Sequence, residues 1–207
     1  MAQGAFGSPF ATGTRVFLND GAGNFSPSFV QLPRPAGGDW GSTSIQVADF
    51  DGDARADILV ALELPNRRHA LQLWLQKTAG TFVDESVSAF GRYEVYFDFW
   101  REFSVGDFDG DGDVDIYLRQ GSSASPTETA DRLRRAIFLN DGHAKFSNPQ
   151  HDIVLSEETR PVFLVPLRVK TNAFTLIGYE VDGGASGAYT SVTPVTIELR
   201  LPVQGGR

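Results

Sequence analysis

The sequence predicts an all-β fold made of repeated four-stranded antiparallel units, and three observations support this prediction. The 22 Gly and 11 Pro among 207 residues argue against a helical bundle. Sixteen Phe against a single Met favour strands over long helices. Residues 45–60 recur as residues 103–118, each with an acidic loop followed by an apolar run, so the chain contains an internal repeat.

The strands of the first unit follow from the spacing of apolar side chains and from turn residues. Leu71, Leu73 and Leu75 occupy alternate positions, and apolar runs stand before and after the acidic loop, as is typical of strands. The sequence Thr-Ala-Gly at 78–80 is typical of a hairpin turn, because Gly adopts a positive φ at little cost. The strands are expected at 44–48, 58–64, 70–76 and 81–84.

The remaining segments are interpreted by comparison with this unit. The sequence Phe-Leu-Asn-Asp-Gly occurs at 17–21 and again at 138–142, so residues 14–32 resemble only the last two strands of a unit. A second complete unit is expected at about 102–106, 115–119, 134–140 and 145–147, with a polar insert at 120–131. Strand-like runs without an acidic loop follow at about 161–169, 174–181 and 193–201.

Each acidic loop carries aspartates at its first, third, fifth and ninth positions. These like charges repel one another strongly unless a cation neutralises them. Calcium suits them because it accepts six to eight oxygen ligands in flexible geometry, whereas magnesium demands a tight octahedron. The backbone carbonyl of the seventh residue would supply a further oxygen. The expected ligands of two calcium sites are Asp49, Asp51, Asp53, Arg55 and Asp57 in the first loop and Asp107, Asp109, Asp111, Asp113 and Asp115 in the second.

The spacing of these loops begins like that of an EF-hand but departs from it at position 12. An EF-hand has a bidentate Glu there, whereas these loops have Val60 and Leu118. The flanking segments are strand-like, and neither loop runs into an amphipathic helix. The EF-hand is therefore excluded.

The loops and turns together resemble the FG-GAP/VCBS repeats of integrin-type β-propellers. The resemblance covers about residues 14–147 and rests on the acidic loops, the Ile-Leu-Val or Ile-Tyr-Leu that follows them, and the Phe-Leu-Asn-Asp-Gly and Gly-x-Phe turns. It implies that each loop joins the first two strands of a blade and binds calcium. The family mostly builds seven blades, and this chain can supply about three to four.

The expected architecture is therefore a β-propeller-like array of four-stranded antiparallel blades, incomplete or closed by strand exchange. Closure by exchange would pair strands within 152–207 with residues 14–32 or with another copy of the chain. The whole of 1–207 is expected to form a single domain. Its parts are a half blade at 14–32, blades at 44–84 and 102–147, and a degenerate blade or closing strands at 152–207.

The two loops are not expected to bind calcium equally well. The sixth position makes a sharp turn with positive φ, which Gly112 adopts freely. Ala54 either adopts this conformation at a cost of about 1–2 kcal/mol or distorts the loop. The seventh position has Arg55 in the first loop and Asp113 in the second. The second loop is therefore predicted to bind calcium more tightly.

Composition excludes several functional classes. Without cysteine, the chain has no disulfides, no thiolate zinc site and no cysteine nucleophile. A net charge of −8, with no basic run longer than the pairs 67–68 and 134–135, makes nucleic acid an unsuitable partner. The chain has no transmembrane segment, and residues 1–15 have no intact signal peptide.

The expected function is that of an extracellular binding or adhesion module, secreted or at the cell surface or periplasm, with a protein or carbohydrate ligand. The alternatives are a polysaccharide-acting enzyme on a propeller scaffold and a structural subunit of a larger assembly that self-associates through open sheet edges. No catalytic residue is identified. The aromatic run from Tyr93 to Trp100 forms either a strand packed on both faces or a surface that stacks on a sugar ring.

Overall fold

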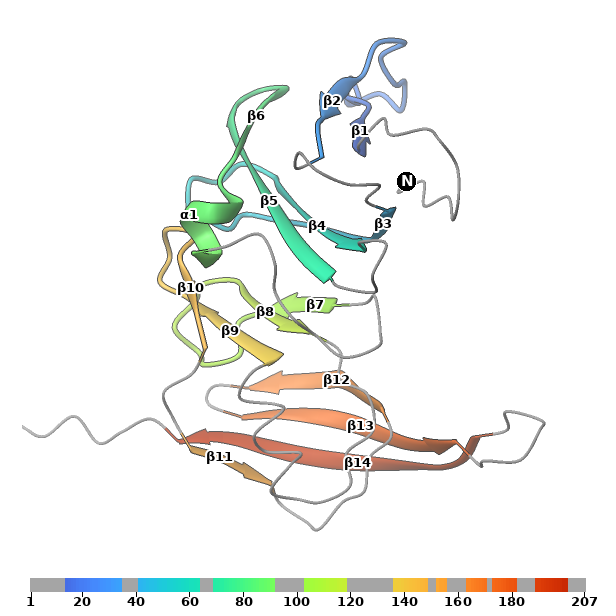
Figure 1. The fold of residues 1–207 in the computed structure, drawn as a ribbon, viewed down its shortest axis with the longest axis vertical. Helices are drawn as coiled ribbons and strands as arrows, with labels where there is room; N and C mark the ends of the chain where they lie inside the picture. The colour runs from blue at the N-terminus through green and yellow to red at the C-terminus, as the bar shows by residue number, and fades with distance from the viewer. Residues whose placement is uncertain are drawn as a thin grey trace, which may run out of the picture. The chain divides into compact units, whose positions relative to one another are not determined.

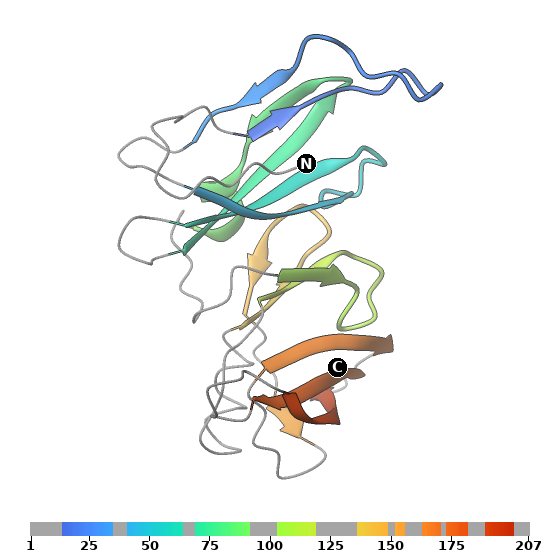
Figure 2. The same cartoon turned by 90° about the vertical axis from the view of Figure 1, so that its right-hand side faces the viewer.

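The computed structural model describes residues 14–34, 41–63, 69–91, 103–118, 136–148, 152–155, 163–170, 173–181 and 189–200. Apart from one short helix, the regular elements in these ranges are strands (Figures 1 and 2). They form one two-stranded sheet and three four-stranded sheets, all antiparallel, which confirms the all-β, propeller-like fold predicted from the sequence.

The chain divides into two compact units. The first consists of Met1–Tyr96 with His143–Lys145, and the second of Phe97–Gly142 with Phe146–Arg207. The organisation of 1–207 as a single domain stays a prediction.

The first complete blade lies in the first unit. Its strands pair in chain order, β3 (Gly41–Ala48), β4 (Asp57–Glu63), β5 (His69–Thr78) and β6 (Thr81–Asp84). The run Ile58 to Leu62 is buried on both faces of the sheet, which explains why it reads as a continuous apolar segment. The predicted strands are present, and β3 and β5 are longer than expected.

The half blade is a hairpin that packs against this complete blade. Strand β1 (Thr14–Val16) pairs with β2 (Val30–Leu32), and a bridge between Asn19 and Phe25 extends the hairpin. Leu32 lies in the buried apolar cluster of the neighbouring sheet, with Trp74 and residues of β4. Side-chain packing of this kind stabilises stacked sheets.

Helix α1 (Ser86–Phe90) is an element that the sequence did not predict. The Oδ1 of Asp84 accepts a hydrogen bond from the backbone N–H of Ser86 at 3.0 Å, and the Oγ of Ser86 accepts one from Leu73 N at 2.9 Å. Gly91 ends the helix with φ 71°. Five residues are too few to show a helical period, so hydrophobic spacing gave no signal.

The second complete blade lies in the second unit and has the same strand order. Its strands are β7 (Phe103–Gly106), β8 (Asp115–Leu118), β9 (Ile137–Asn140) and β10 (Phe146–Ser147). Phe108 and Tyr117 are fully buried in its core and meet edge to face at 6.4 Å. The predicted polar insert at 120–131 and the aromatic run at 93–100 lie outside the described residues.

The C-terminal strands form a third four-stranded sheet with a different order. Strands β11 (Asp152–Leu155), β12 (Phe163–Lys170), β13 (Ala173–Val181) and β14 (Tyr189–Arg200) are arranged β11-β14-β13-β12. The sequence predicted the last three and missed β11. Among the described residues, the strands of this segment and of 14–32 pair only within their own segment, and closure by strand exchange stays a prediction.

No helix in the described ranges has the length and apolar character needed to cross a membrane.

Candidate metal centre

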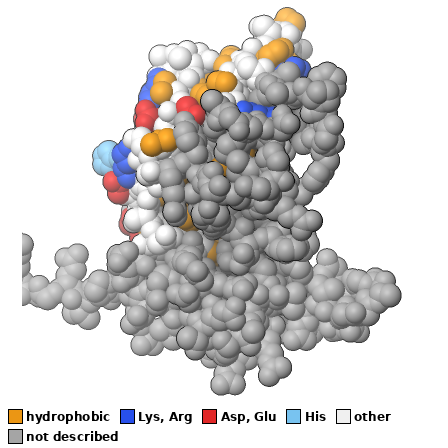
Figure 3. All heavy atoms as spheres, in the orientation of Figure 1, with side chains coloured by type: hydrophobic (Ala, Val, Ile, Leu, Met, Phe, Trp, Pro, Cys, Tyr) orange, Lys and Arg blue, Asp and Glu red, His pale blue; other side chains and the backbone are white. Residues whose placement is uncertain are grey.

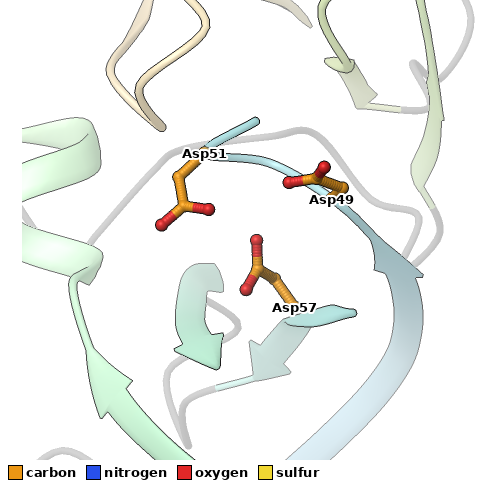
Figure 4. A group of neighbouring side chains, drawn as sticks. All are labelled: Asp49, Asp51 and Asp57. Atoms are coloured by element: carbon orange, nitrogen blue, oxygen red, sulfur yellow. The ribbon is translucent and has the colours of Figure 1, made fainter. Parts of the chain in front are cut away.

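Three carboxylates of each acidic loop converge on one point. In the first blade Asp49 follows β3, Asp51 lies in the loop and Asp57 begins β4. Their oxygens lie within 4.8 Å of one another, and Figure 4 shows all three side chains pointing into the same space. The second blade repeats this arrangement within the same distance, with Asp107, Asp109 and Asp115.

The first aspartate of each loop determines how the loop folds. The carboxylate of Asp49 accepts hydrogen bonds from the backbone N–H groups of Asp53 at 3.1 Å and Ala54 at 2.7 Å. In the second loop, Asp107 accepts them from Gly110 at 2.5 Å and Gly112 at 3.1 Å. The chain thus wraps around this carboxylate, as Asx-type hydrogen bonding favours.

The sixth position of both loops has the positive φ expected from the sequence. Its φ is 64° at Ala54 and 97° at Gly112. Gly52 and Gly110, at the fourth position, also have positive φ. Ala54 therefore adopts the strained left-handed conformation and does not distort the loop.

The last aspartate of each loop ties the loop to the third strand of its blade. Asp57 accepts hydrogen bonds from Phe50 N at 2.9 Å and Gln76 N at 2.8 Å. Asp115 accepts the matching bonds from Phe108 N at 2.7 Å and Asn140 N at 2.8 Å. Because both carboxyl groups are fully buried, these bonds satisfy oxygens that water cannot reach.

Burial and neighbouring charges make these carboxyl groups hard to ionise. Burial, helped by the negative charges of Asp109 and Asp111, raises the pKa of Asp115 to about 7, against the lowering effect of its two backbone hydrogen bonds. Burial likewise raises the pKa of Asp57 and of Asp109. A bound cation would favour the charged forms.

The donor set fits a hard divalent cation. The converging atoms are carboxylate oxygens, which are the ligands that calcium prefers. The Oδ1 of Asp51 is buried and has no hydrogen-bond partner in the protein. An unpaired buried carboxylate oxygen is costly, and a metal ion would supply its missing partner.

The other predicted ligands do not join these converging groups. Asp53 accepts a hydrogen bond from Arg55 N at 2.9 Å and forms an ion pair with the Arg55 guanidinium. The Oδ1 of Asp111 accepts a hydrogen bond from Asp113 N at 2.9 Å. The backbone carbonyls of Arg55 and Asp113 stay predicted ligands.

A lysine that the sequence reasoning missed also contacts the first site. The Nζ of Lys77 lies 3.1 Å from the Oδ2 of Asp51. Lys77 follows Gln76, which pairs with Phe82, and the same register in the second blade places Asp141 after Asn140. The alignment of the two hairpin sequences gives the equivalence of Lys77 and Asp141, but not the contact of Lys77 with the acidic loop.

The comparisons with known proteins agree with the repeat pattern. The family model described as FG-GAP-like repeat matches residues 6–60 and 55–118. No curated protein and no solved structure matches the chain.

Proposed function

Because the chain belongs to the FG-GAP-like repeat family, we propose that it is a calcium-binding repeat module that acts in binding or adhesion outside the cytoplasm. The main support is that three carboxylates converge in each of two equivalent loops. In the first loop, one buried oxygen of Asp51 has no hydrogen-bond partner. Calcium would stabilise the turn between the first two strands of each blade by neutralising these groups.

The three converging aspartates of each loop would hold the ion. Asp57 and Asp115 already use both oxygens as hydrogen-bond acceptors, and a carboxylate oxygen has a second lone pair for a cation. The proposed location outside the cytoplasm follows from calcium supply. Extracellular modules bind calcium with Kd of about 10⁻⁴–10⁻³ M and are occupied in that environment.

Calorimetric titration of the full chain with calcium tests the metal sites. Asp51→Asn is expected to abolish binding at the first loop, and Asp109→Asn at the second. Asp20→Asn is the matched control, because it removes one negative charge from an exposed turn outside both loops. A titration without calcium binding, or one that Asp20→Asn weakens as much as the loop variants do, would contradict the proposal.

Thermal unfolding supplies a second readout of the same sites. A site that exists only in the folded chain stabilises it by about 2.7 kcal/mol at a calcium concentration one hundred times Kd. The unfolding midpoint should therefore rise with calcium and fall with chelator. An unchanged midpoint in a chain that binds calcium by calorimetry would show that the unfolded chain binds equally well.

Fractionation of cells from the native host tests the proposed location. The tagged chain should appear in the medium, at the surface or in the periplasm, where external protease reaches it. Recovery only in the cytoplasm would overturn the extracellular role and leave the metal sites unaffected.

A further inference from the structure

Three hairpins of this chain share one register. Gln76 pairs with Phe82 in the first complete blade, Asn140 pairs with Phe146 in the second, and Asn19 pairs with Phe25 in the half blade. The fifth residue of each of these seven-residue stretches has positive φ, namely Gly80, Ala144 and Gly23. The half blade is therefore the structural equivalent of the outer two strands of a complete blade.

In the complete blades, the inner edge of this hairpin is covered by the strand that follows the acidic loop. Gln76 N donates to Asp57, and Ile58 lies beside Trp74. In the second blade Asn140 N donates to Asp115, and Ile116 lies beside Phe138. An aspartate followed by isoleucine thus makes the same two contacts in each blade.

In the half blade, the equivalent donor, the backbone N–H of Asn19, faces an edge that no described strand covers. Ser26 N donates to Leu18 O at 2.8 Å and Asp20 N to Asn24 O at 3.0 Å, so Asn19 and Phe25 form a non-hydrogen-bonded pair. The backbone N–H of a residue in such a pair points away from its partner strand. Among the described residues, no carboxylate takes the place beside Asn19 N that Asp57 and Asp115 take in the blades.

The apolar side chains at this edge are exposed where their equivalents are buried. Phe17 is 48% exposed, whereas Trp74 and Phe138 are 5% and 6% exposed. On the other strand of the hairpin, Phe25 is 66% exposed, whereas its equivalents Phe146 and Phe82 are buried and partly buried. Figure 3 shows hydrophobic side chains on the surface in the region of the β1–β2 hairpin. Grouped exposed aromatic residues of this kind mark interaction sites.

We propose that the open edge of β1 is a docking site for the inner half of a blade from a partner chain. The docking segment would consist of two antiparallel strands joined by an acidic loop of the same repeat type. The last aspartate of that loop would accept a hydrogen bond from Asn19 N, and the isoleucine or valine after it would pack beside Phe17. The binding mode is strand addition to a sheet edge.

The described strands of this chain do not supply such a segment. Strands β4 and β8 already pair on both edges within their own blades. Residues 1–13 contain no Asp or Glu, and residues 152–207 contain no acidic loop. A second copy would have to unpair a central strand to donate one. We assign the inner half blade to a partner chain, because the described strands that could form one are already paired.

A fluorescent peptide with the sequence of residues 103–118 serves as the probe. When the full chain is titrated into this peptide in the presence of calcium, fluorescence anisotropy should show saturable binding. Phe17→Thr in the chain should weaken binding by about tenfold, because the incoming strand loses an aromatic contact. A peptide with Asp115→Asn should bind similarly weakly. Val83→Thr is the matched control, since Val83 is 41% exposed on β6 and should leave binding unchanged.

Hydrogen exchange on the unmodified chain provides a readout that needs no variant. The probe should slow exchange of the Asn19 amide and leave β6 unchanged. The proposal would be overturned if the probe did not bind saturably, or if it slowed amide exchange in β6 and not in β1. It would also be overturned if Val83→Thr weakened probe binding as much as Phe17→Thr does. If the chain alone formed a dimer that Phe17→Thr dissociated, the proposal would also be overturned, because a second copy would then be the occupant of this edge. Calcium binding is measured separately, so a chain that binds calcium but not the probe contradicts this inference alone.

Discussion

Lys77 forms an ion pair with Asp51, with 3.1 Å between Nζ and Oδ2, so the first acidic loop is partly neutralised by the protein itself. Arg55 likewise pairs with Asp53 and donates through Nε to Gln76 O at 2.6 Å. The register of the second blade places aspartates, Asp113 and Asp141, at the two positions that these cations occupy. The first loop therefore depends less on an added cation than the second.

Replacement of Lys77 should strengthen calcium binding at the first loop. In a chain whose second loop is disabled by Asp109→Asn, Lys77→Gln removes the cation that competes for Asp51. Exposed ion pairs are worth about 0.2–1 kcal/mol, so the affinity should rise by up to about fivefold. Arg15→Gln is the control, because Arg15 lies over the Phe29 ring, 4.6 Å from its centroid. Calorimetry that finds the same affinity for both variants would show that Lys77 does not compete.

Replacement of Ala54 by Gly should stabilise the folded chain by about 1 kcal/mol, because φ at this position is 64° and Gly adopts it without strain. Ala144→Gly should gain less, since the relief of its φ of 56° is offset by the loss of a buried methyl group. Ala61→Gly is a control with the opposite expected sign. It should destabilise the folded chain, because Ala61 is buried within strand β4. Denaturant unfolding measures all three, and a destabilised Ala54→Gly variant would contradict the strain argument.

Alanine substitutions at two equivalent turn glycines should reduce the stability of the folded chain by different amounts. Gly21 and Gly142 have φ of 82° and 78°, so Ala at either one costs about 1–2 kcal/mol. A Cβ on Gly21 would meet nothing within 4 Å, whereas a Cβ on Gly142 would lie 2.6 Å from the Oδ2 of Asp113. Thermal unfolding should therefore show a larger loss for Gly142→Ala. Equal losses would show that the Asp113 side chain moves away freely.

The stability of the calcium-free chain should fall as pH rises from about 4 to about 7. Folding raises the pKa of Asp115 from 3.8 to about 7, so the folded chain holds a proton in this window that the unfolded chain has lost. Stability decreases with pH wherever the folded state binds more protons. Asp115→Asn removes this titration, and thermal unfolding in chelator should then vary less with pH.

Calcium should oppose this pH effect. The ion favours the ionised carboxylates, so the rise in unfolding midpoint caused by calcium should be larger at pH 8 than at pH 5. A calcium effect that is equal at both pH values would contradict the placement of Asp115 at a metal site.

The sequence predicted the repeated blades and the convergence of their aspartates because both depend on local patterns. Alternating apolar residues and Gly turns determine β5 and β6, and the spacing of the loop brings its first, third and ninth residues together. Of the two outcomes expected at position 54, a strained conformation or a distorted loop, the φ of 64° shows the first.

The missed features depend on pairings between distant segments. The contact of Lys77 with Asp51 follows from the register of β5 on β4, which sequence spacing alone does not determine. Strand β11 pairs with β14, which is the last of these four strands in chain order, through residues such as Asp152 and Arg200. A local period gives no information about such an order, so the pairing of the C-terminal strands could not be predicted.

The way the β1–β2 hairpin is attached has a mechanical consequence. Its contacts with its neighbour include the packing of Leu32, Val16 and Val30, the 2.9 Å bond from Gln72 Nε2 to Pro33 O, and a contact between Thr14 and Ser42. No backbone ladder connects it to β3–β6 within the described residues. Among those residues, release of the hairpin therefore breaks side-chain contacts but no backbone ladder. Under tension applied through residue 14, this hairpin would detach first, extending the chain while the four-stranded blade beside it stays folded.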